Sequence, residues 1–338
     1  MASEFYAPGL MDLSSYRLEE INDTVMWDRF VSRSEQGSVF NLTAFLDALE
    51  KPIRKWGCYK GSELKGAICV VETIQSGTVA IIRPSLLIYN SILLPRPDPQ
   101  QAKANQFAEE FRTVSAMVKE LMQRYTSVSL QTHFSFTDLR PFLWHNYGTE
   151  LPKFEVKPKF TAILQQPNDY AKAVELQDNK LYQQCSKSRR QEIRYAISKN
   201  VVVEKRFDMM LFETLYRQTF ERQGLSVDEA QFSAMQRVCQ TLYEQQQLTM
   251  YIASDYEDNV GSIAVFANVG GAAYYLYGAN SPIAKTAHTG SYVIFFACDD
   301  LFKSGISDVD LEGVNSPARG HFKLSFGAEL KQYYAITY

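Results

Sequence analysis

The sequence predicts an α/β (α+β) protein built from two tandem copies of one domain, each a mixed, mostly antiparallel sheet flanked by helices. The chain has 338 residues, more than one ordinary core accommodates, and its 46% apolar and 22% charged residues are typical of a folded globular protein. Strand-like and helix-like runs follow one another in the same order in both halves. In addition, residues 143–151 (LWHNYGTEL) are echoed by residues 322–330 (FKLSFGAEL), which indicates an internal duplication.

In the first half, Asn41 is positioned to cap a short helix that Pro52 ends. Phe107, Phe111, Val114, Val118 and Leu121 recur at intervals of three and four, so they predict one buried face of a long helix. The predicted helices are 23–32, 42–50, 101–125 and 138–144, and the predicted strands are 53–59, 64–73, 79–82, 86–94, 128–133 and 154–164.

In the second half, prolines around 152–167 mark a boundary, so we expect domains at residues 1–165 and 166–338. The predicted helices are 181–199, 209–223, 227–246, 290–303 and one from about 319 to 327. The predicted strands are 201–206, 249–254, 261–268, 272–279, 309–314 and 331–338.

The bulk charge and the cysteines exclude several classes of protein. A net charge of −3 with a pI near 5.9 is not that of a DNA-binding protein. The five cysteines are scattered and without metal-site spacing, so we expect free thiols and no metal. We see neither a secretion signal nor a run apolar enough to span a bilayer, and therefore expect a cytoplasmic protein without membrane attachment.

The segment 308–330 carries the strongest chemical signal. Its acidic strand leads through a Gly/Asn/Ser/Pro turn into a short helix. Alternation places Asp310 and Glu312 on one face, where they could bind and deprotonate a cationic amine, although a solvated strand end explains them equally well. His288 is a further candidate base, and an exposed loop histidine is its alternative.

The element order of the second half resembles that of the GNAT acyltransferase domain. In that fold the fourth and fifth strands splay apart, and a carrier thioester lies in the gap with its pyrophosphate on the start of the following helix. The resemblance therefore implies a coenzyme A thioester as donor. It places the donor site at Tyr277, Gly278 and Ala279 on the fourth strand, and at Lys285, Thr286, Thr289, Gly290 and Ser291 before and within the helix start. An ordinary cap by Thr289 before a core helix is the alternative.

The closing motif resembles more narrowly the Fem-type branch, in which two GNAT-like domains occur in tandem. It consists of Asp310-x-x-Gly313 followed by Gly320-x-Phe322-Lys323-x-x-Phe326-Gly327. The resemblance implies a catalytic role for Lys323, and we expect Asn315, Arg319 and His321 to contact substrate. An arginine-rich helix that begins near Arg189 also fits this branch; it could meet tRNA phosphate, but a solvated helix face is the more common explanation.

These observations predict an N-acyltransferase that moves an acyl group from a coenzyme A thioester to the amino group of a nucleotide-linked amino sugar, for surface polysaccharide such as lipopolysaccharide or capsule. Only the second copy should carry a donor site, because prolines of the 95–99 connection remove N–H donors that a pyrophosphate needs. The first copy would then line the acceptor cleft or mediate homodimer formation. The alternatives are an aminoacyl-tRNA-dependent transferase acting on a peptidoglycan precursor, and a degenerate pair that binds without catalysis.

Overall fold

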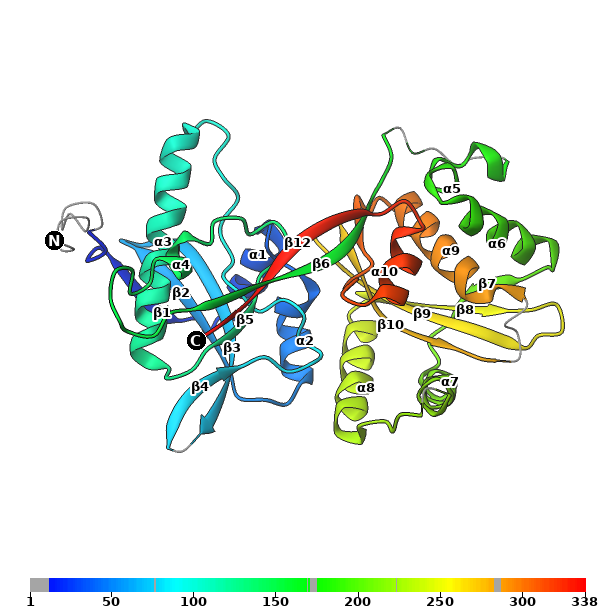
Figure 1. The fold of residues 1–338 in the computed structure, drawn as a ribbon, viewed down its shortest axis with the longest axis horizontal. Coiled ribbons are helices and arrows are strands. Elements are labelled where there is room, and N and C mark those ends of the chain that lie inside the picture. The colour runs from blue at the N-terminus through cyan, green and yellow to red at the C-terminus, as the bar shows by residue number, and fades with distance from the viewer. Residues whose placement is uncertain (1–11, 76, 169, 171–174, 223, 283–286) are drawn as a thin grey trace. The chain divides into compact units, whose positions relative to one another are not determined.

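The computed structural model describes residues 12–75, 77–168, 170, 175–222, 224–282 and 287–338. The chain forms two compact units (Figure 1). Unit 1 comprises residues up to Lys159 together with Gln332–Tyr338, and unit 2 comprises Phe160–Lys331. The sequence-based domains 1–165 and 166–338 are contiguous, whereas the end of the chain belongs to unit 1, because residues 335–337 pair with the strand of residues 129–131.

Unit 1 is built on a four-stranded antiparallel sheet of order β1-β2-β3-β4. Val114, Met117, Val118 and Leu121 of α3 pack in a core that includes sheet residues such as Ile68. Its elements are β1 (Tyr16–Glu20), α1 (Thr24–Arg33), a 3-10 turn (Val39–Asn41), α2 (Thr43–Ala48), β2 (Ile53–Lys60), β3 (Glu63–Gln75), β4 (Thr78–Ile82), α3 (Lys103–Arg124), β5 (Ser129–Gln131) and α4 (Arg140–Leu143), after which β6 (Glu155–Gln165) begins.

Three sequence expectations for unit 1 differ from the structure. Asn41 does not cap α2, which follows Leu42; its Oδ1 accepts hydrogen bonds from the Ser38 amide and hydroxyl instead. Residues 86–94 form no continuous strand and contact the sheet through an isolated bridge between Ala67 and Leu93. Phe107 is not on the buried face of α3, since it is 56% exposed. The three-four spacing identifies a helical face correctly but not where along the helix the sheet stops covering it.

Unit 2 has a sheet in which β7, β8, β9 and β10 are antiparallel, β11 runs parallel to β10, and the end of β6 pairs antiparallel with β11. Figure 1 shows α9 against one face of this sheet and α7 and α8 against the other. Its elements are a 3-10 turn (Leu176–Asp178), α5 (Lys180–Gln184), α6 (Lys187–Ser198), β7 (Val202–Lys205), α7 (Met209–Glu221), α8 (Glu229–Glu244), β8 (Leu248–Ser254), β9 (Val260–Val269), β10 (Ala272–Asn280), α9 (Thr289–Lys303), β11 (Asp308–Asp310), α10 (Pro317–Leu324) and the start of β12 (Glu329–Thr337).

Both units follow one element order: a strand, two helices, three antiparallel strands, a helix, a strand, a short helix and a last strand. The echoed segments occupy equivalent places, one after α4 and one at the end of α10. Each contains a glycine in the left-handed region, Gly148 at φ 73° and Gly327 at φ 89°. The repeated Gly therefore lies in the turn that follows a short helix in both units, and a residue without Cβ adopts this conformation at low cost.

Local differences in unit 2 have local causes. The helix expected over 181–199 is divided into α5 and α6, because Ser186 caps α6 through a hydrogen bond from the Arg189 amide. The strand expected over 309–314 ends at Asp310, and Glu312 adopts a left-handed conformation at φ 59°.

A buried histidine makes the stability of unit 1 depend on pH. His133 is 6% exposed, its Nδ1 lies 2.8 Å from Ser135 Oγ, and its ring packs 5.0 Å from that of Tyr89. Burial lowers the pKa of His133 to about 3, well below its ordinary value of 6.5. The folded state thus favours the neutral ring. The contribution of His133 to the stability of unit 1 is present above pH 6.5 and is lost as the pH falls towards 3.

We expect the titration of His133 alone to lower the free energy of unfolding by about 2 kcal/mol when the pH is lowered from 7 to 5. Denaturant titrations at the two pH values measure it, with the exposed His321→Gln variant as the matched control. The His133→Gln variant should lose this part of the pH dependence and His321→Gln should keep it. Equal pH dependence in both variants would contradict the assignment.

Candidate active site

The candidate site lies where β10 and β11 stop pairing. The two strands are paired in parallel over Ala272–Tyr274 and Asp308–Asp310, after which β10 continues to Asn280 and β11 ends. The register of β10 against β9 shifts between Tyr275 and Tyr277, which marks a bulge. The segment that follows Asp310 therefore no longer pairs with β10, while the Leu311 and Val314 amides still donate to the carbonyl oxygens of Ala162 and Phe160 on β6.

Asp310 is held firmly at the last position of β11. Its side chain is 3% exposed, and Oδ1 accepts hydrogen bonds from Thr161 Oγ1 at 2.5 Å and from the Glu312 amide at 2.7 Å. Thr161 belongs to β6. Two donors on one oxygen stabilise a carboxylate, so Asp310 is a fixed acceptor that shapes the turn carrying Glu312.

Glu312 has the properties of a proton acceptor. It is 9% exposed, and its Oε1 has no hydrogen-bond partner within the described part of the chain. Burial, and secondly the charge of Asp310, raise the pKa of Glu312 well above 4.5, while the ammonium of Lys323 acts in the opposite direction. A carboxyl with a raised pKa and an unused oxygen suits general acid–base chemistry.

Lys323 brings a cation from α10 to these carboxylates. Its Nζ lies 3.4 Å from the Gly313 carbonyl oxygen and 5.6 Å from the centre of the Tyr275 ring. Burial lowers the pKa of Lys323, while Glu312 and Asp310 raise it. The structure thus brings three predicted residues, Asp310, Glu312 and Lys323, into one interacting group.

Tyr275 is a site residue that the sequence analysis missed. A Cβ placed on Gly278 would lie 1.9 Å from Tyr275 Oη, so the tyrosine hydroxyl occupies the space over this glycine. Burial raises the pKa of Tyr275, which keeps the hydroxyl protonated and able to donate. Tyr277 is partly buried and Ala279 fully buried on the same strand.

We expect Gly278→Ala to displace the Tyr275 side chain and to lower stability by about 1–3 kcal/mol, as overpacking does. Denaturant unfolding in wild-type and Tyr275→Phe backgrounds measures the effect. The phenylalanine lacks the clashing oxygen, so the alanine should cost less there. An equal cost in both backgrounds would show that the hydroxyl is not the obstacle.

The start of α9 is held by side-chain contacts. Thr289 Oγ1 lies 2.8 Å from Ser262 Oγ, and a Cβ on Gly290 would lie 2.9 Å from Asn280 Oδ1. Ser291 Oγ donates to Glu192 Oε2 at 2.5 Å, which places a carboxylate beside the first turn. The predicted donor residues Lys285 and Thr286 lie outside the described residues.

His288 is set apart from the carboxylates. It precedes α9 in a left-handed conformation, φ 57°, and stacks on Tyr195 at 5.8 Å. Tyr274 of β10 pairs with Asp310, and β10 continues from there for about 20 Å to Asn280. Gly290 at the start of α9 packs against the Asn280 side chain. The structure therefore groups His288 with the start of α9 and not with Glu312.

The three predicted substrate residues have different surroundings. The amide of Asn315 donates to and accepts from the backbone of Phe160, at 3.1 and 2.9 Å, so it anchors the turn after β11. Arg319 and His321 are exposed on α10. Burial lowers the pKa of Lys323, and the positive charge of Arg319 acts in the same direction. Burial raises the pKa of Tyr216 on α7, and the charge of Arg319 opposes this.

Arg189 has a structural role that its sequence context did not indicate. It is 6% exposed, donates to Ser325 Oγ at 2.9 Å, and also contacts Glu192 and Ser291. Its guanidinium lies 4.4 Å from the ring centre of Phe322 and 4.7 Å from that of Phe326. Since these partners lie on α6, α9 and α10, Arg189 joins three helices around the site and is not part of a solvated basic face.

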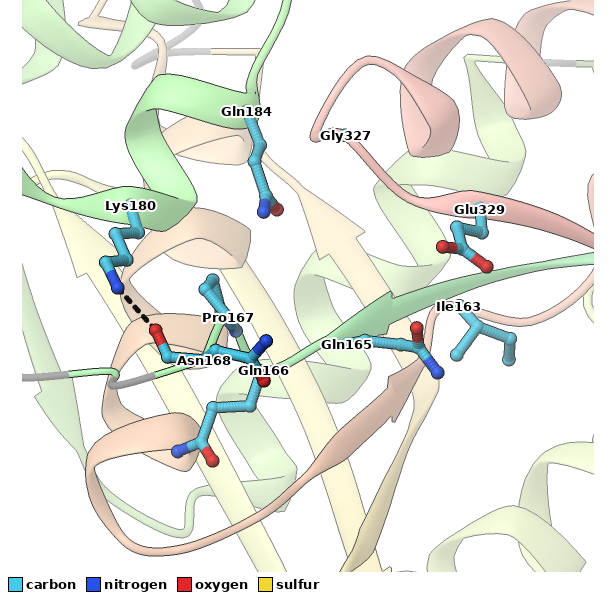
Figure 2. A pocket seen from close by; sticks show the side chains of 9 residues that line it. All are labelled: Ile163, Gln165, Gln166, Pro167, Asn168, Lys180, Gln184, Gly327 and Glu329. Carbon is cyan, nitrogen blue, oxygen red and sulfur yellow. Dashed lines mark hydrogen bonds between the residues drawn. The ribbon is translucent and has the colours of Figure 1, made fainter.

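A polar cavity of about 440 Å³ lies in unit 2 (Figure 2). Its lining includes the amide side chains of Gln165, Gln166 and Gln184, together with Lys180 and Glu329. Ile163 also lines it and pairs directly with Asp310, so the two side chains share one face of the sheet. The cavity thus shares the strand β6 with the candidate site, although Asp310, Glu312 and Lys323 do not line it.

Comparisons with known proteins identify the fold. No family model and no curated protein match the sequence. The crystal structure of FemX matches with a TM-score of 0.70 and 12% identity, over 94% of this chain and 96% of that chain. L-PGS from Bacillus licheniformis matches with a TM-score of 0.52 and 9% identity, over 93% and 91%. A tandem GNAT protein from the clavulanic acid biosynthesis pathway matches with a TM-score of 0.50 and 9% identity, over 95% and 97%.

The chain has the tandem GNAT fold, which it shares with FemX and with the tandem GNAT protein, as the sequence predicted. At these identities the likeness concerns the fold. Among the described residues, there is no group of histidine, cysteine, aspartate and glutamate side chains suited to a metal ion. Within the same ranges, no helix has the length and apolar character needed to cross a membrane.

Proposed function

We propose that the protein is an N-acyltransferase that moves an acyl group from an activated carrier to a primary amine. Glu312 carries the proposal, because it is buried, has an unused oxygen and a raised pKa, and lies where β10 and β11 part. In the reaction Glu312 accepts a proton from the acceptor ammonium, and the freed nitrogen forms a C–N bond with the acyl carbon. The bond to the carrier breaks, and the leaving atom takes up a proton.

For the donor we propose a coenzyme A thioester. Two features support this donor: β10 and β11 stop pairing after Tyr274 and Asp310, and α9 begins after the end of β10, where its Gly290 packs closely against Asn280. The amides at the start of a helix favour an anion such as pyrophosphate. A tyrosine hydroxyl over Gly278 offers a donor near the proposed acyl oxygen.

For the acceptor we propose a nucleotide-linked amino sugar. The cavity beside β6 supports this, because its glutamine amides both donate and accept hydrogen bonds, as sugar hydroxyls require. Lys180 and Glu329 oppose each other in charge, so the lining suits a neutral polyhydroxyl group. The Gln184→Ala variant should raise KM for the sugar more than it lowers kcat.

A second candidate donor is aminoacyl-tRNA. The cations of α6 favour it, while the Glu192 carboxylate beside the first turn of α9 is paired with Arg189 and decides neither way. Lys187 and Arg194 on α6 are exposed and Arg190 is half-buried, so α6 offers cations to a phosphate backbone.

Calorimetry with acetyl-coenzyme A and a gel shift with charged tRNA separate the two donors. We expect binding of acetyl-coenzyme A, and thiol release when UDP-linked amino sugars are added. Binding of tRNA without binding of acetyl-coenzyme A would contradict the thioester as donor but would be compatible with acyl transfer. No transfer from either donor to a panel of amino sugars and peptidoglycan precursors would overturn the enzymatic proposal in favour of a binding protein.

A further inference from the structure

Unit 1 contains a pocket that none of the predicted site residues lines. It has a volume of about 380 Å³ and lies among α3, α4 and the last residue of the chain, Tyr338. A volume of this order is typical of sites for small molecules. We propose that this pocket binds a small apolar molecule that ends in an anionic group.

The lining of the pocket is mainly aromatic and aliphatic. Phe111 and Trp144 meet edge to face at 5.5 Å, and His145 and Tyr338 do so at 5.6 Å. Val118 and Met122 of α3 complete the apolar wall. Trp144 remains 43% exposed although it lies in this cluster. Aromatic side chains left open to solvent around a concavity offer large contact area at low conformational cost.

Charge determines which apolar ligand suits the pocket. Lys119 is part of the lining, whereas no aspartate or glutamate is found among the described lining residues. Burial lowers the pKa of His145, so its ring is neutral at pH 7 and can serve as an apolar surface. Arg140 lies 4.8 Å from the ring centre of Phe111 and 5.6 Å from that of Trp144, but its guanidinium is paired with the Asp138 carboxylate, so Lys119 is the cation on which the charge argument rests. The pocket therefore favours a carboxylate, sulfonate or phosphate at the polar end of the ligand.

Large apolar side chains close in sequence to the lining residues are also exposed to solvent. At least half of the side-chain surface is exposed in each of four residues: Phe107, Leu143, Tyr147 and Leu151. An apolar rim around a concave site lowers the cost of desolvating an amphiphile. A protein partner would use the same exposed apolar side chains, but it would not require the anionic preference that Lys119 creates.

Binding of 8-anilinonaphthalene-1-sulfonate to the full chain, followed by its fluorescence, tests the proposal. We expect the probe to bind saturably and octanoate to displace it. Octylamine, the cationic counterpart of octanoate, should displace the probe about tenfold less well. The Trp144→Ala variant should bind the probe about tenfold more weakly. The Lys119→Gln variant should bind octanoate about fivefold more weakly. Lys103→Gln is the matched control, because Lys103 is exposed on the same helix and does not line the pocket.

Circular dichroism shows whether each variant remains folded, which the exposure of Trp144 and Lys119 leads us to expect. Equal probe binding by wild type and Trp144→Ala would overturn the proposal, because the probe would then bind elsewhere. Equal displacement by octanoate and octylamine would overturn the anionic preference. Absence of saturable probe binding would overturn the site altogether. Since the pocket and Glu312 are tested in separate assays, none of these results bears on acyl transfer.

Discussion

Replacement of Glu312 by glutamine should lower kcat by about 10²- to 10⁴-fold, the range that a positioned general base contributes. The amide keeps the size of the side chain but cannot accept the acceptor proton. The same change removes a buried carboxyl whose charged form is disfavoured by its surroundings, so the variant should be at least as stable as the wild type. Steady-state kinetics with acetyl-coenzyme A and a UDP-linked amino sugar, together with denaturant unfolding, measure both effects.

The pH dependence of kcat/KM provides the sharper test. Glu312 must be ionised to act as base, so activity should rise with pH through its raised pKa. Removing the Asp310 charge in Asp310→Asn should lower this pKa and move the rise to lower pH, and Lys323→Met should move it to higher pH. Asp310→Asn retains the acceptor oxygen that holds Thr161 and the Glu312 amide. Full activity of Glu312→Gln, or shifts of the same sign in both other variants, would contradict the role of Glu312.

Replacement of Arg189 by methionine should lower the free energy of unfolding by about 3 kcal/mol, because it leaves buried hydrogen-bonding groups unpaired and removes a stacked cation. The groups affected are Ser325 on α10 and Ser291 on α9, together with the rings of Phe322 and Phe326. Arg189→Lys should recover only part of the loss, since lysine lacks the planar fork that both stacks and donates in several directions. Urea unfolding measures the three proteins.

The matched control is Arg190→Met, the next residue along the same helix, which is half-buried and should cost less than about 1 kcal/mol. Glu192 contacts Arg189, so the double variant Arg189→Met, Glu192→Gln should recover stability relative to Arg189→Met alone. Equal costs at positions 189 and 190 would show that Arg189 does not join the helices as the contacts indicate.

Much of the architecture was accessible from local sequence. The spacing of apolar residues and the turn glycines predicted most elements, and the repeated Gly-small-Glu-Leu segment predicted that two units share one plan. These signals act over a few residues. Gly148 and Gly327 lie in the turns after the short helices of both units for the same reason, a left-handed conformation that disfavours a Cβ. Asp310, Glu312 and Lys323 could be proposed as site residues in the same way, because they lie within one short segment whose motif can be read along the chain.

The tertiary structure alone decided which groups act on these residues. Thr161 reaches Asp310 across 149 positions of sequence, and Arg189 reaches Ser291 across 102, so no local pattern records either contact. The same holds for Tyr275 over Gly278, which depends on the bulge in β10, and for the raised pKa of Glu312, which depends on burial by the surrounding unit. The sequence by itself determined the repeated fold and the acidic segment that begins with β11, since propensity and turn chemistry are local. Only packing decided that Glu312 is the candidate base, because desolvation and charge act through space.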